Sequence, residues 1–217
     1  MMRPLSECRL YTFVDTAYSR GRSPQSVAQQ LCDGGSDLIQ LRAKSSPAEE
    51  IRRMAALILP ITIRAGVYLV INDHPHIAAD VGAPLCHLGQ EDFFGAGYTR
   101  VSQLASLGWR VGVGLSTHAP SQAERAVAAG AEYIAAGPVY PTATKPTAKP
   151  ATLDYMRWAA ANIRCPWFAI GGINPGNLDD VLAAGARRIC VVSAILNAPD
   201  IAEACQNFKN RLLSAKL

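Results

Sequence analysis

Short apolar runs rich in β-branched residues alternate with amphipathic stretches along the whole chain. Residues 67–73 form one such run, which ends at Asn72 and Asp73, and residues 84–92 form another, which ends at Glu91 and Asp92. A short helical pattern lies between them, so the three segments predict one βαβ unit. Because a right-handed crossover makes the two strands parallel, Asp73 and Asp92 are expected to face one space.

The same alternation predicts about eight βα units. Expected strands cover 9–14, 38–42, 67–73, 84–92, 110–115, 133–137, 167–170 and 188–192. Expected helices begin at Ser23-Pro24 and at Ser46-Pro47, and others cover 77–82, 99–107, 120–130, 153–162, 175–184 and 199–213.

This pattern predicts an α/β fold with one domain over residues 1–217, a compact (β/α)8 TIM barrel of parallel strands. A doubly wound open sheet is the alternative. Against it, no GxGxxG motif follows the first strand, and the Gly-rich turns come late, in units seven and eight, where barrels commonly hold a phosphate.

Composition narrows the class of protein. Apolar residues make up 49% and charged residues 18%, and no apolar run approaches the roughly 20 residues of a membrane span. The first residues lack an apolar signal core, so we expect a cytoplasmic protein without membrane contact. The six cysteines show no CxxC or CxxH spacing and are interpreted as reduced core residues, with neither zinc nor disulfides.

The net charge of +4 is spread along the chain without a basic block, which argues against a nucleic-acid partner and suits anionic small molecules. Polar residues gather at the expected strand ends. Asp73 and Asp92 there predict a site for Mg²⁺, which takes few protein carboxylates and completes its shell with water and phosphate. The alternative is that these carboxylates cap the following helices.

Cations stand at the same strand ends. Arg42 and Lys44 alternate with Leu41 and Ala43 and so share one face, where two positive groups need an anion, and Lys145 adds a third in a loop rich in hydroxyls. The set predicts a diphosphate site. In the alternative, Arg42 and Lys44 form a structural ion network with Asp73 and Asp92.

Two late turns predict a second phosphate site. Gly171-Gly172 and Val192-Ser193 allow close backbone approach and are expected to offer N–H donors at a helix start.

Seven blocks of sequence resemble the thiamine-phosphate synthase family, in family order and spacing over nearly the whole chain. They are Gln40-Leu-Arg-Ala-Lys44, Ile71-Asn-Asp73, His87-Leu-Gly-Gln-Glu-Asp92, Ser116-Thr-His118, Gly137-Pro-Val-Tyr-Pro-Thr-Ala-Thr-Lys145, Ala169-Ile-Gly-Gly-Ile173 and Val191-Val-Ser-Ala-Ile195. The resemblance implies a TIM-barrel transferase of thiamine biosynthesis. Its phosphorylated small-molecule substrates would be 4-amino-2-methyl-5-hydroxymethylpyrimidine diphosphate and 4-methyl-5-(2-hydroxyethyl)thiazole phosphate.

The resemblance also implies roles for single residues. Asp73 and Asp92 would hold Mg²⁺, while Arg42, Lys44, Asn72 and Lys145 would grip the diphosphate, with Arg42, Lys44 and Lys145 as the catalytic cations. Gln40 and Ser116 would face the aminopyrimidine. The substrate-binding set is completed by Leu41 and Ala43, which lie in the first block, and by the thiazole-phosphate residues Thr142, Ala143, Thr144, Gly172, Val192 and Ser193.

The chain departs from the family pattern at His74-Pro75-His76 and in the loop after Lys145, which lacks a Gly that the family often has. His74 and His76 are interpreted as surface or helix-cap residues, and His118 either touches substrate or makes a structural hydrogen bond. A thiazole tautomerase and a catalytically idle sensor of thiazole or thiamine phosphate are the other functions considered. Barrels of this kind often pair, so a homo-oligomer is expected, with no interface located.

Overall fold

The computed structural model describes residues 2–108, 110–142 and 150–215. Its strands are β1 (Leu10–Asp15), β2 (Leu38–Arg42), β3 (Tyr68–Asn72), β4 (Leu85–Leu88), β5 (Gly112–Thr117), β6 (Tyr133–Ala136), β7 (Trp167–Ile170) and β8 (Ile189–Cys190). All neighbours pair in parallel, and β8 pairs with β1, so the sheet is a closed eight-stranded barrel. The predicted TIM barrel is therefore confirmed, and the open sheet is excluded.

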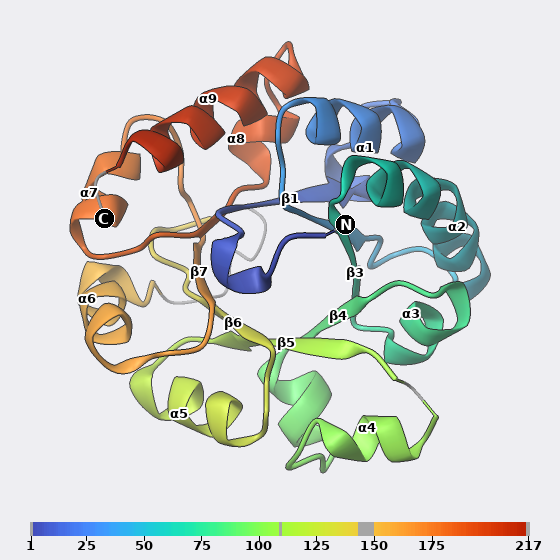
Figure 1. Cartoon of the computed structure of the whole chain (residues 1–217), viewed down its shortest axis with the longest axis horizontal. Coiled ribbons are helices and arrows are strands. Elements are labelled where there is room, and N and C mark those ends of the chain that lie inside the picture. The colour runs from blue at the N-terminus through green and yellow to red at the C-terminus, as the bar shows by residue number, and fades with distance from the viewer. Residues whose placement is uncertain (1, 109, 143–149, 216–217) are drawn as a thin grey trace.

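Helices surround the barrel (Figure 1). They are α1 (Pro24–Asp33), α2 (Ala48–Ala65), α3 (Pro75–Val81), α4 (Ser102–Ser106), α5 (Pro120–Ala128), α6 (Thr152–Asn162), α7 (Leu178–Ala183), α8 (Ser193–Leu196) and α9 (Ile201–Ser214), with single turns η1 (Leu5–Glu7), η2 (Thr16–Tyr18) and η3 (Glu91–Gly95). Local sequence explains the starts: the Ser23 hydroxyl accepts from Ser26 N, and Asp200 caps α9 by accepting from Glu203 N. No helix in the described part of the chain is both long and apolar enough to cross a bilayer.

An aromatic cluster fills the barrel interior. Tyr11 from β1, Tyr133 from β6 and Phe168 from β7 are fully buried and meet edge to face, with ring centroids 5.5 to 5.7 Å apart. Each such pair contributes roughly 0.5–1.5 kcal/mol beyond the burial of its area. Gly114 of β5 makes room for the cluster, because a Cβ atom there would lie 2.0 Å from Cζ of Tyr133.

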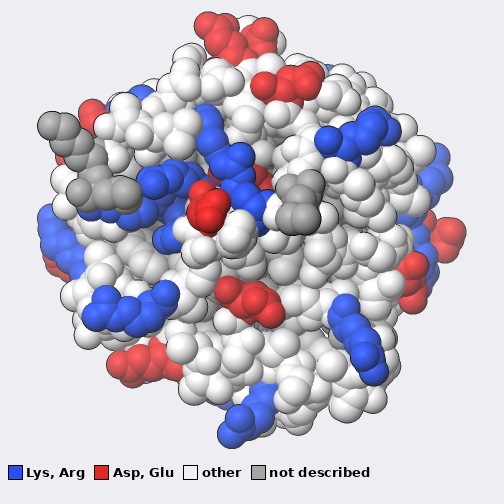
Figure 2. Space-filling model, viewed as in Figure 1, with Lys and Arg blue, Asp and Glu red and all other residues white. Residues whose placement is uncertain are grey.

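The N-terminal segment lies across the end of the barrel where the strands begin, in the foreground of Figure 1. Tyr68 at the start of β3 donates its hydroxyl to the Arg3 carbonyl at 3.0 Å, and Arg188 donates to the Ser6 carbonyl at 2.5 Å. Figure 2, from the same side, shows acidic and basic side chains interspersed over this face. In (β/α)8 barrels the functional groups lie at the opposite end, where the strands stop.

Two predicted boundaries differ from the structure for local reasons, and one short helix lies outside the predicted ranges. The fourth strand stops at Leu88, and Asp92 lies in η3, because the chain turns at Gly89 and Gln90. The helix expected from residue 175 begins at Leu178, since Asn174 and Asn177 bond to the intervening backbone and hold a turn there. Helix α8 is not among the predicted helix ranges, because four residues are too few to show a periodic pattern, although a helix start was expected at Val192-Ser193.

Candidate active site

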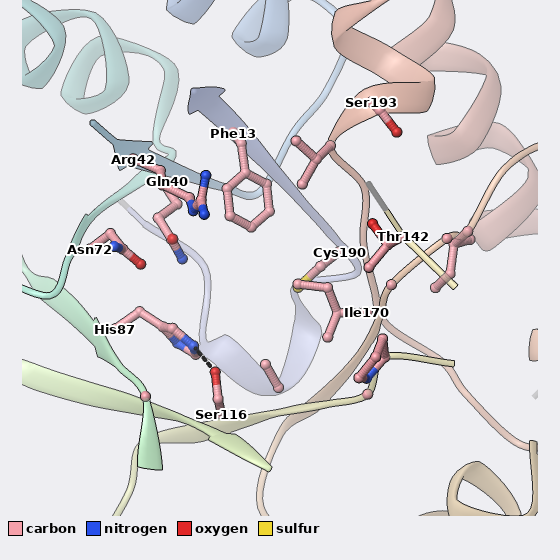
Figure 3. Close-up of a pocket in the computed structure, with 18 of the residues that line it drawn as sticks. Phe13, Gln40, Arg42, Asn72, His87, Ser116, Thr142, Ile170, Cys190 and Ser193 are labelled. Carbon is pink, nitrogen blue, oxygen red and sulfur yellow. Dashed lines mark hydrogen bonds between the residues drawn. The ribbon is translucent and has the colours of Figure 1, made fainter. Parts of the chain in front are cut away.

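A pocket opens at the C-terminal ends of the strands (Figure 3). Among the described residues of the predicted site, those with side chains or backbone on its lining are Gln40, Arg42, Lys44, Asn72, Asp73, Asp92, Ser116, Thr142, Gly172, Val192 and Ser193. They come from strands all round the barrel but meet at one place, because parallel strands of a closed barrel release their ends on one face.

Two predicted residues that the structure describes, Leu41 and Ala43, are not on the lining of this pocket. The side chains of Leu41 and Ala43 are buried in the core, with 1% and 4% of their surface exposed. Ala143, Thr144 and Lys145 lie outside the described residues, so their roles stay predictions.

Arg42 is oriented by a partner that the sequence analysis missed. Its Nη1 atom donates to Oδ2 of Asp15 at 2.8 Å, and the Asp15 side chain is only 1% exposed. Asp15 ends β1 and also accepts from the Ala17 backbone N–H at 2.9 Å. The strand-end rule that found Asp73 applies equally to Asp15. This buried carboxylate fixes the guanidinium at the pocket edge, where it also lines the pocket.

Asp73 is held in a conformation that few residues adopt. Its φ is +61°, in the left-handed region, and its backbone N–H donates to the His87 carbonyl at 2.9 Å. Its Oδ2 atom accepts from Asn72 Nδ2 at 2.6 Å and lies 3.3 Å from Lys44 Nζ. A non-Gly residue at this φ costs of order 1–3 kcal/mol, Asp adopts it more readily than most residues, and such residues cluster at functional sites. The ion pair expected in the structural-network alternative is thus present between Lys44 and Asp73, whereas Arg42 pairs with Asp15 instead.

Asp92 reaches the same pocket from η3. Its Oδ2 atom accepts from the Gly89 backbone N–H at 3.2 Å, and the neighbouring Gln90 donates to the Ser116 carbonyl at 2.6 Å, which ties this turn to β5. No group of three or more His, Cys, Asp or Glu side chains is positioned to enclose a metal in the described part of the chain. Two carboxylates on one pocket nevertheless fit Mg²⁺, which keeps several waters and takes the rest of its ligands from substrate phosphate.

The histidines around the site differ in their contacts. His74 takes the N-cap position of α3, and burial, followed by the nearby His76, lowers its pKa. His118 lines the pocket but bonds through Nδ1 to the Gly137 carbonyl, while its backbone N–H donates to Gln122 Oε1 at 2.8 Å. The structural hydrogen bond, one of the two roles considered for His118, is therefore present, and the side chain also lies on the pocket.

Glycines shape the side of the pocket near β7. Gly171 and Gly172 have φ values of +103° and +67°, and a Cβ atom on Gly172 would lie 2.7 Å from the Pro141 carbonyl oxygen. The Gly171 carbonyl accepts from Tyr140 N at 3.1 Å, so the segment before Thr142 packs directly on this turn. Gly172 was expected at a helix start, but α7 starts only at Leu178. The Gly172 backbone nevertheless lines the pocket, where a ligand can approach it closely.

A chain of buried polar groups runs beneath the pocket. Gln40 Nε2 donates to Tyr11 Oη at 2.5 Å, Tyr11 Oη lies 2.9 Å from Tyr133 Oη, and His87 contacts Tyr133 Oη through Nδ1 and Ser116 Oγ through Nε2. Tyr11 and Tyr133 were not predicted as part of a site, because a tyrosine inside a strand looks like core. Only their hydroxyl positions, which the fold determines, show the connection.

Comparisons with known proteins decide the family. A family model described as thiamine monophosphate synthase matches residues 10–195. A thiamine-phosphate synthase of Acidothermus cellulolyticus is 42% identical over 218 residues, 99% of this chain and 100% of that protein. The chain belongs to the thiamine-phosphate synthase family. It is thus a transferase with thiamine-phosphate synthase activity, in thiamine biosynthesis.

Further relatives agree with this assignment. A thiamine-phosphate synthase of Thermus thermophilus is 46% identical over 180 residues, 82% of this chain and 84% of that protein. In fold, the chain is similar to a thiamine phosphate pyrophosphorylase of Pyrococcus furiosus, with a TM-score of 0.86 at 24% identity, over 98% of this chain and 99% of that one. The synthase is therefore favoured over the tautomerase and the sensor.

Proposed function

We propose that this family member joins 4-amino-2-methyl-5-hydroxymethylpyrimidine diphosphate to 4-methyl-5-(2-hydroxyethyl)thiazole phosphate at the pocket of Figure 3. The products would be thiamine phosphate and diphosphate. The observation that carries the proposal is the pairing of two cations, Arg42 and Lys44, with two carboxylates, Asp73 and Asp92, on one pocket. That arrangement suits a magnesium diphosphate leaving group better than any neutral ligand.

The leaving group would lie between β2 and β3. Arg42 is pre-oriented by Asp15, so its guanidinium can donate to diphosphate oxygens with little loss of side-chain freedom. Lys44, half exposed beside Asp73, is free to move onto the ligand, and Asn72 can donate an amide N–H. Lys145 would add charge from the loop after β6. Mg²⁺ held by Asp73 and Asp92 would neutralise the departing diphosphate.

The aminopyrimidine would lie deeper in the pocket, against Gln40 and Ser116. Both side chains lie on strands and are fixed by hydrogen bonds on their buried sides, which keeps the ring in one orientation. We assign Leu41 and Ala43 to this region through their backbone alone, since their side chains are buried.

The thiazole phosphate would lie on the opposite side, toward β7 and β8. Gly172 lets a phosphate approach the backbone closely, and Val192 and Ser193 line the same side at the start of α8. Thr142 offers a hydroxyl there, and the following Ala143 and Thr144 would extend this contact.

The arrangement favours bond breaking ahead of attack. The bond from the pyrimidine methylene carbon to the diphosphate oxygen breaks, and its electron pair leaves with the diphosphate. The electron-rich aminopyrimidine carries the positive charge that remains. The thiazole nitrogen then donates its lone pair to the methylene carbon and forms the new C–N bond. No proton needs to be removed from the nitrogen that attacks, so positioning and charge stabilisation account for catalysis.

Product analysis tests this proposal. Purified protein is mixed with the pyrimidine diphosphate and Mg²⁺, with and without the thiazole phosphate, and released diphosphate and thiamine phosphate are measured. The proposal requires both products only when both substrates are present. Folded protein that binds either substrate but releases no diphosphate would overturn it and favour a sensor.

A loop variant tests the leaving-group assignment. Replacing Lys145 by Ala should lower kcat by about 100-fold, because one charge on the diphosphate is lost in the transition state. A near-normal kcat for Lys145→Ala would show that this residue does not contact the leaving group.

Two finer expectations also belong here. A cytoplasmic location is supported by six cysteines that are all free thiols, four of them buried. A homo-oligomer remains a prediction, for which size-exclusion chromatography with light scattering is the direct measurement.

A further inference from the structure

In the buried polar chain beneath the pocket, successive hydrogen bonds donate in one sense along the chain. It connects Gln40 to Ser116 through Tyr11, Tyr133 and His87, with every contact between 2.5 and 3.1 Å. The two end residues, Gln40 and Ser116, line the pocket, and the tyrosines between them lie beneath it. Figure 3 shows Gln40, His87 and Ser116 around the cavity, with the bond from His87 to Ser116 dashed. The orientation of one end is therefore coupled to that of the other.

The position of Gln40 Nε2 against Tyr11 Oη, together with the number of protons on each group, sets this direction. The Gln40 amide nitrogen can only donate, so Tyr11 Oη accepts from it and directs its own proton to Tyr133 Oη. Tyr133 in turn directs its proton to Nδ1 of His87, which must then be an acceptor. A neutral imidazole with an acceptor at Nδ1 carries its proton on Nε2 and donates it to Ser116 Oγ.

The surroundings hold the hydroxyls in place and keep their protons on. Burial raises the pKa of both Tyr11 and Tyr133 well above the ordinary value, so each phenol retains the one proton that it donates. Both rings pack edge to face against Phe168, which prevents their hydroxyls from turning elsewhere.

We propose that Tyr11, Tyr133 and His87 are positioning residues that set the hydrogen-bonding sense of Gln40 and Ser116 and thereby select a 4-aminopyrimidine over its 4-oxo counterpart. The inference rests on the proposed function, in which these two residues face the pyrimidine. With the chain in this direction, Gln40 presents its carbonyl oxygen to the pocket, and Ser116 presents its own hydroxyl proton.

That pair of groups is complementary to an aminopyrimidine. The amino group donates to an acceptor, and the adjacent unprotonated ring nitrogen accepts from a donor. A 4-oxo ring presents a carbonyl and a ring N–H, so both of its contacts would be mismatched. In the reversed chain, Gln40 would present its amide N–H and Ser116 a lone pair, which matches the oxo ring instead. One direction therefore fixes both contacts together.

The tautomer of His87 tests the inference without any turnover. Long-range ¹H–¹⁵N NMR of the ligand-free protein, with His87 assigned by a His87→Gln variant, should show a proton on Nε2 and none on Nδ1. A proton on Nδ1, or protons on both nitrogens, would overturn the proposed direction whether or not the protein forms thiamine phosphate.

Kinetics of Tyr133→Phe give a second test. Loss of this hydroxyl breaks the chain between Tyr11 and His87, so KM for the pyrimidine diphosphate should rise about tenfold, the worth of one net hydrogen bond. KM for the thiazole phosphate should not change. Inhibition by the 4-oxo analogue should weaken less than binding of the amino substrate, so discrimination between them falls.

Tyr155→Phe is the matched control. Tyr155 is also buried, and its hydroxyl lies 2.6 Å from Thr117 Oγ1, but this bond lies outside the chain from Gln40 to Ser116. Both KM values should stay at the wild-type level in this variant. An unchanged pyrimidine KM in Tyr133→Phe, or equal losses in both variants, would overturn the inference, while wild-type thiamine phosphate formation separately tests the proposed function.

Discussion

Carboxylates at the two ends of the barrel lie in opposite environments. Asp37, at the end where the strands begin, is 4% exposed and accepts from the backbone N–H groups of Arg9 and Leu10 at 2.8 and 3.0 Å. The Lys209 Nζ atom of α9 lies 2.5 Å from Asp37 Oδ2 and forms a buried ion pair with it. Asp73, at the end where the strands stop, has a left-handed φ and a half-exposed lysine as its ion-pair partner.

The difference separates stability from function. A buried, hydrogen-bonded pair joins α9 to the sheet at the end away from the pocket. A strained carboxylate beside an exposed lysine contributes little to stability, but it can exchange partners when a diphosphate and a cation arrive. Substitutions at the two ends should therefore affect different quantities.

The largest effect is expected at the N-terminal end. Asp37→Ala leaves Lys209 buried without its carboxylate, so the free energy of unfolding in urea should fall by about 3–5 kcal/mol, with kcat per folded molecule unchanged. The double variant Asp37→Ala/Lys209→Met should recover part of that loss. A drop in kcat with unchanged stability would contradict the division between the two ends.

Lys44→Ala should show the opposite result. Because Lys44 would contact the leaving diphosphate, kcat should fall about 100-fold. The free energy of unfolding should change by less than about 1 kcal/mol, since the pair with Asp73 is partly exposed. Arg53→Ala is the control: its exposed partner Glu50 lies 3.9 Å away on α2, and kcat should not change. Equal kcat values for both variants would refute the role of Lys44.

A smaller effect is expected at the Gly-rich turn. Gly172→Ala should lower the free energy of unfolding by about 1–2 kcal/mol, because alanine at a φ of +67° is strained. It should also raise KM for the thiazole phosphate, since a Cβ atom would lie 2.7 Å from the Pro141 carbonyl oxygen and displace the segment that carries Thr142. Gly130→Ala carries the same kind of strain at a φ of +87°, with no atom within 4 Å, and should leave KM unchanged. A raised KM in both variants would show that strain alone is responsible.

The smallest effect concerns the layer between the two ends. Burial raises the pKa of Tyr133, so above pH 10 the unfolded chain loses a proton that the folded protein retains. Stability should therefore fall as pH rises above 10, by about 1 kcal/mol per pH unit for each such tyrosine. Urea unfolding between pH 9 and about 11 should show a shallower fall in Tyr133→Phe. If the free energy of unfolding fell equally with pH in both proteins, the group that titrates would not be Tyr133.

Much of the barrel could be predicted from sequence because strand cores and strand ends carry strong local signals. The bounds of β2 and β7 were predicted to the residue, and Pro24 marks the start of α1 as expected. The end of β4 before Gly89 and the start of α7 after residues 174–177 were mispredicted. Hydrogen bonds between side chains and backbone, rather than the hydrophobic period, decide both boundaries.

The pocket was predicted where polar residues end strands, and it was missed where buried residues act together. Asp73 and Arg42 stand out in sequence because charge follows an apolar run. Tyr11 and Tyr133 do not, because they lie far apart in the sequence and their hydroxyls meet only after the barrel closes. Long-range register of this kind is a property of the folded sheet and has no local signal.

Calorimetric titration of the pyrimidine diphosphate, with Mg²⁺ and with EDTA, tests most directly that the C-terminal end is built for a magnesium diphosphate. We expect at least about tenfold weaker binding of the wild-type protein in EDTA. Asp73→Asn combined with Asp92→Asn should abolish this dependence on Mg²⁺ without altering stability by more than about 1 kcal/mol. Full dependence on Mg²⁺ in the double variant would contradict the assignment of both carboxylates and the account of this end of the barrel.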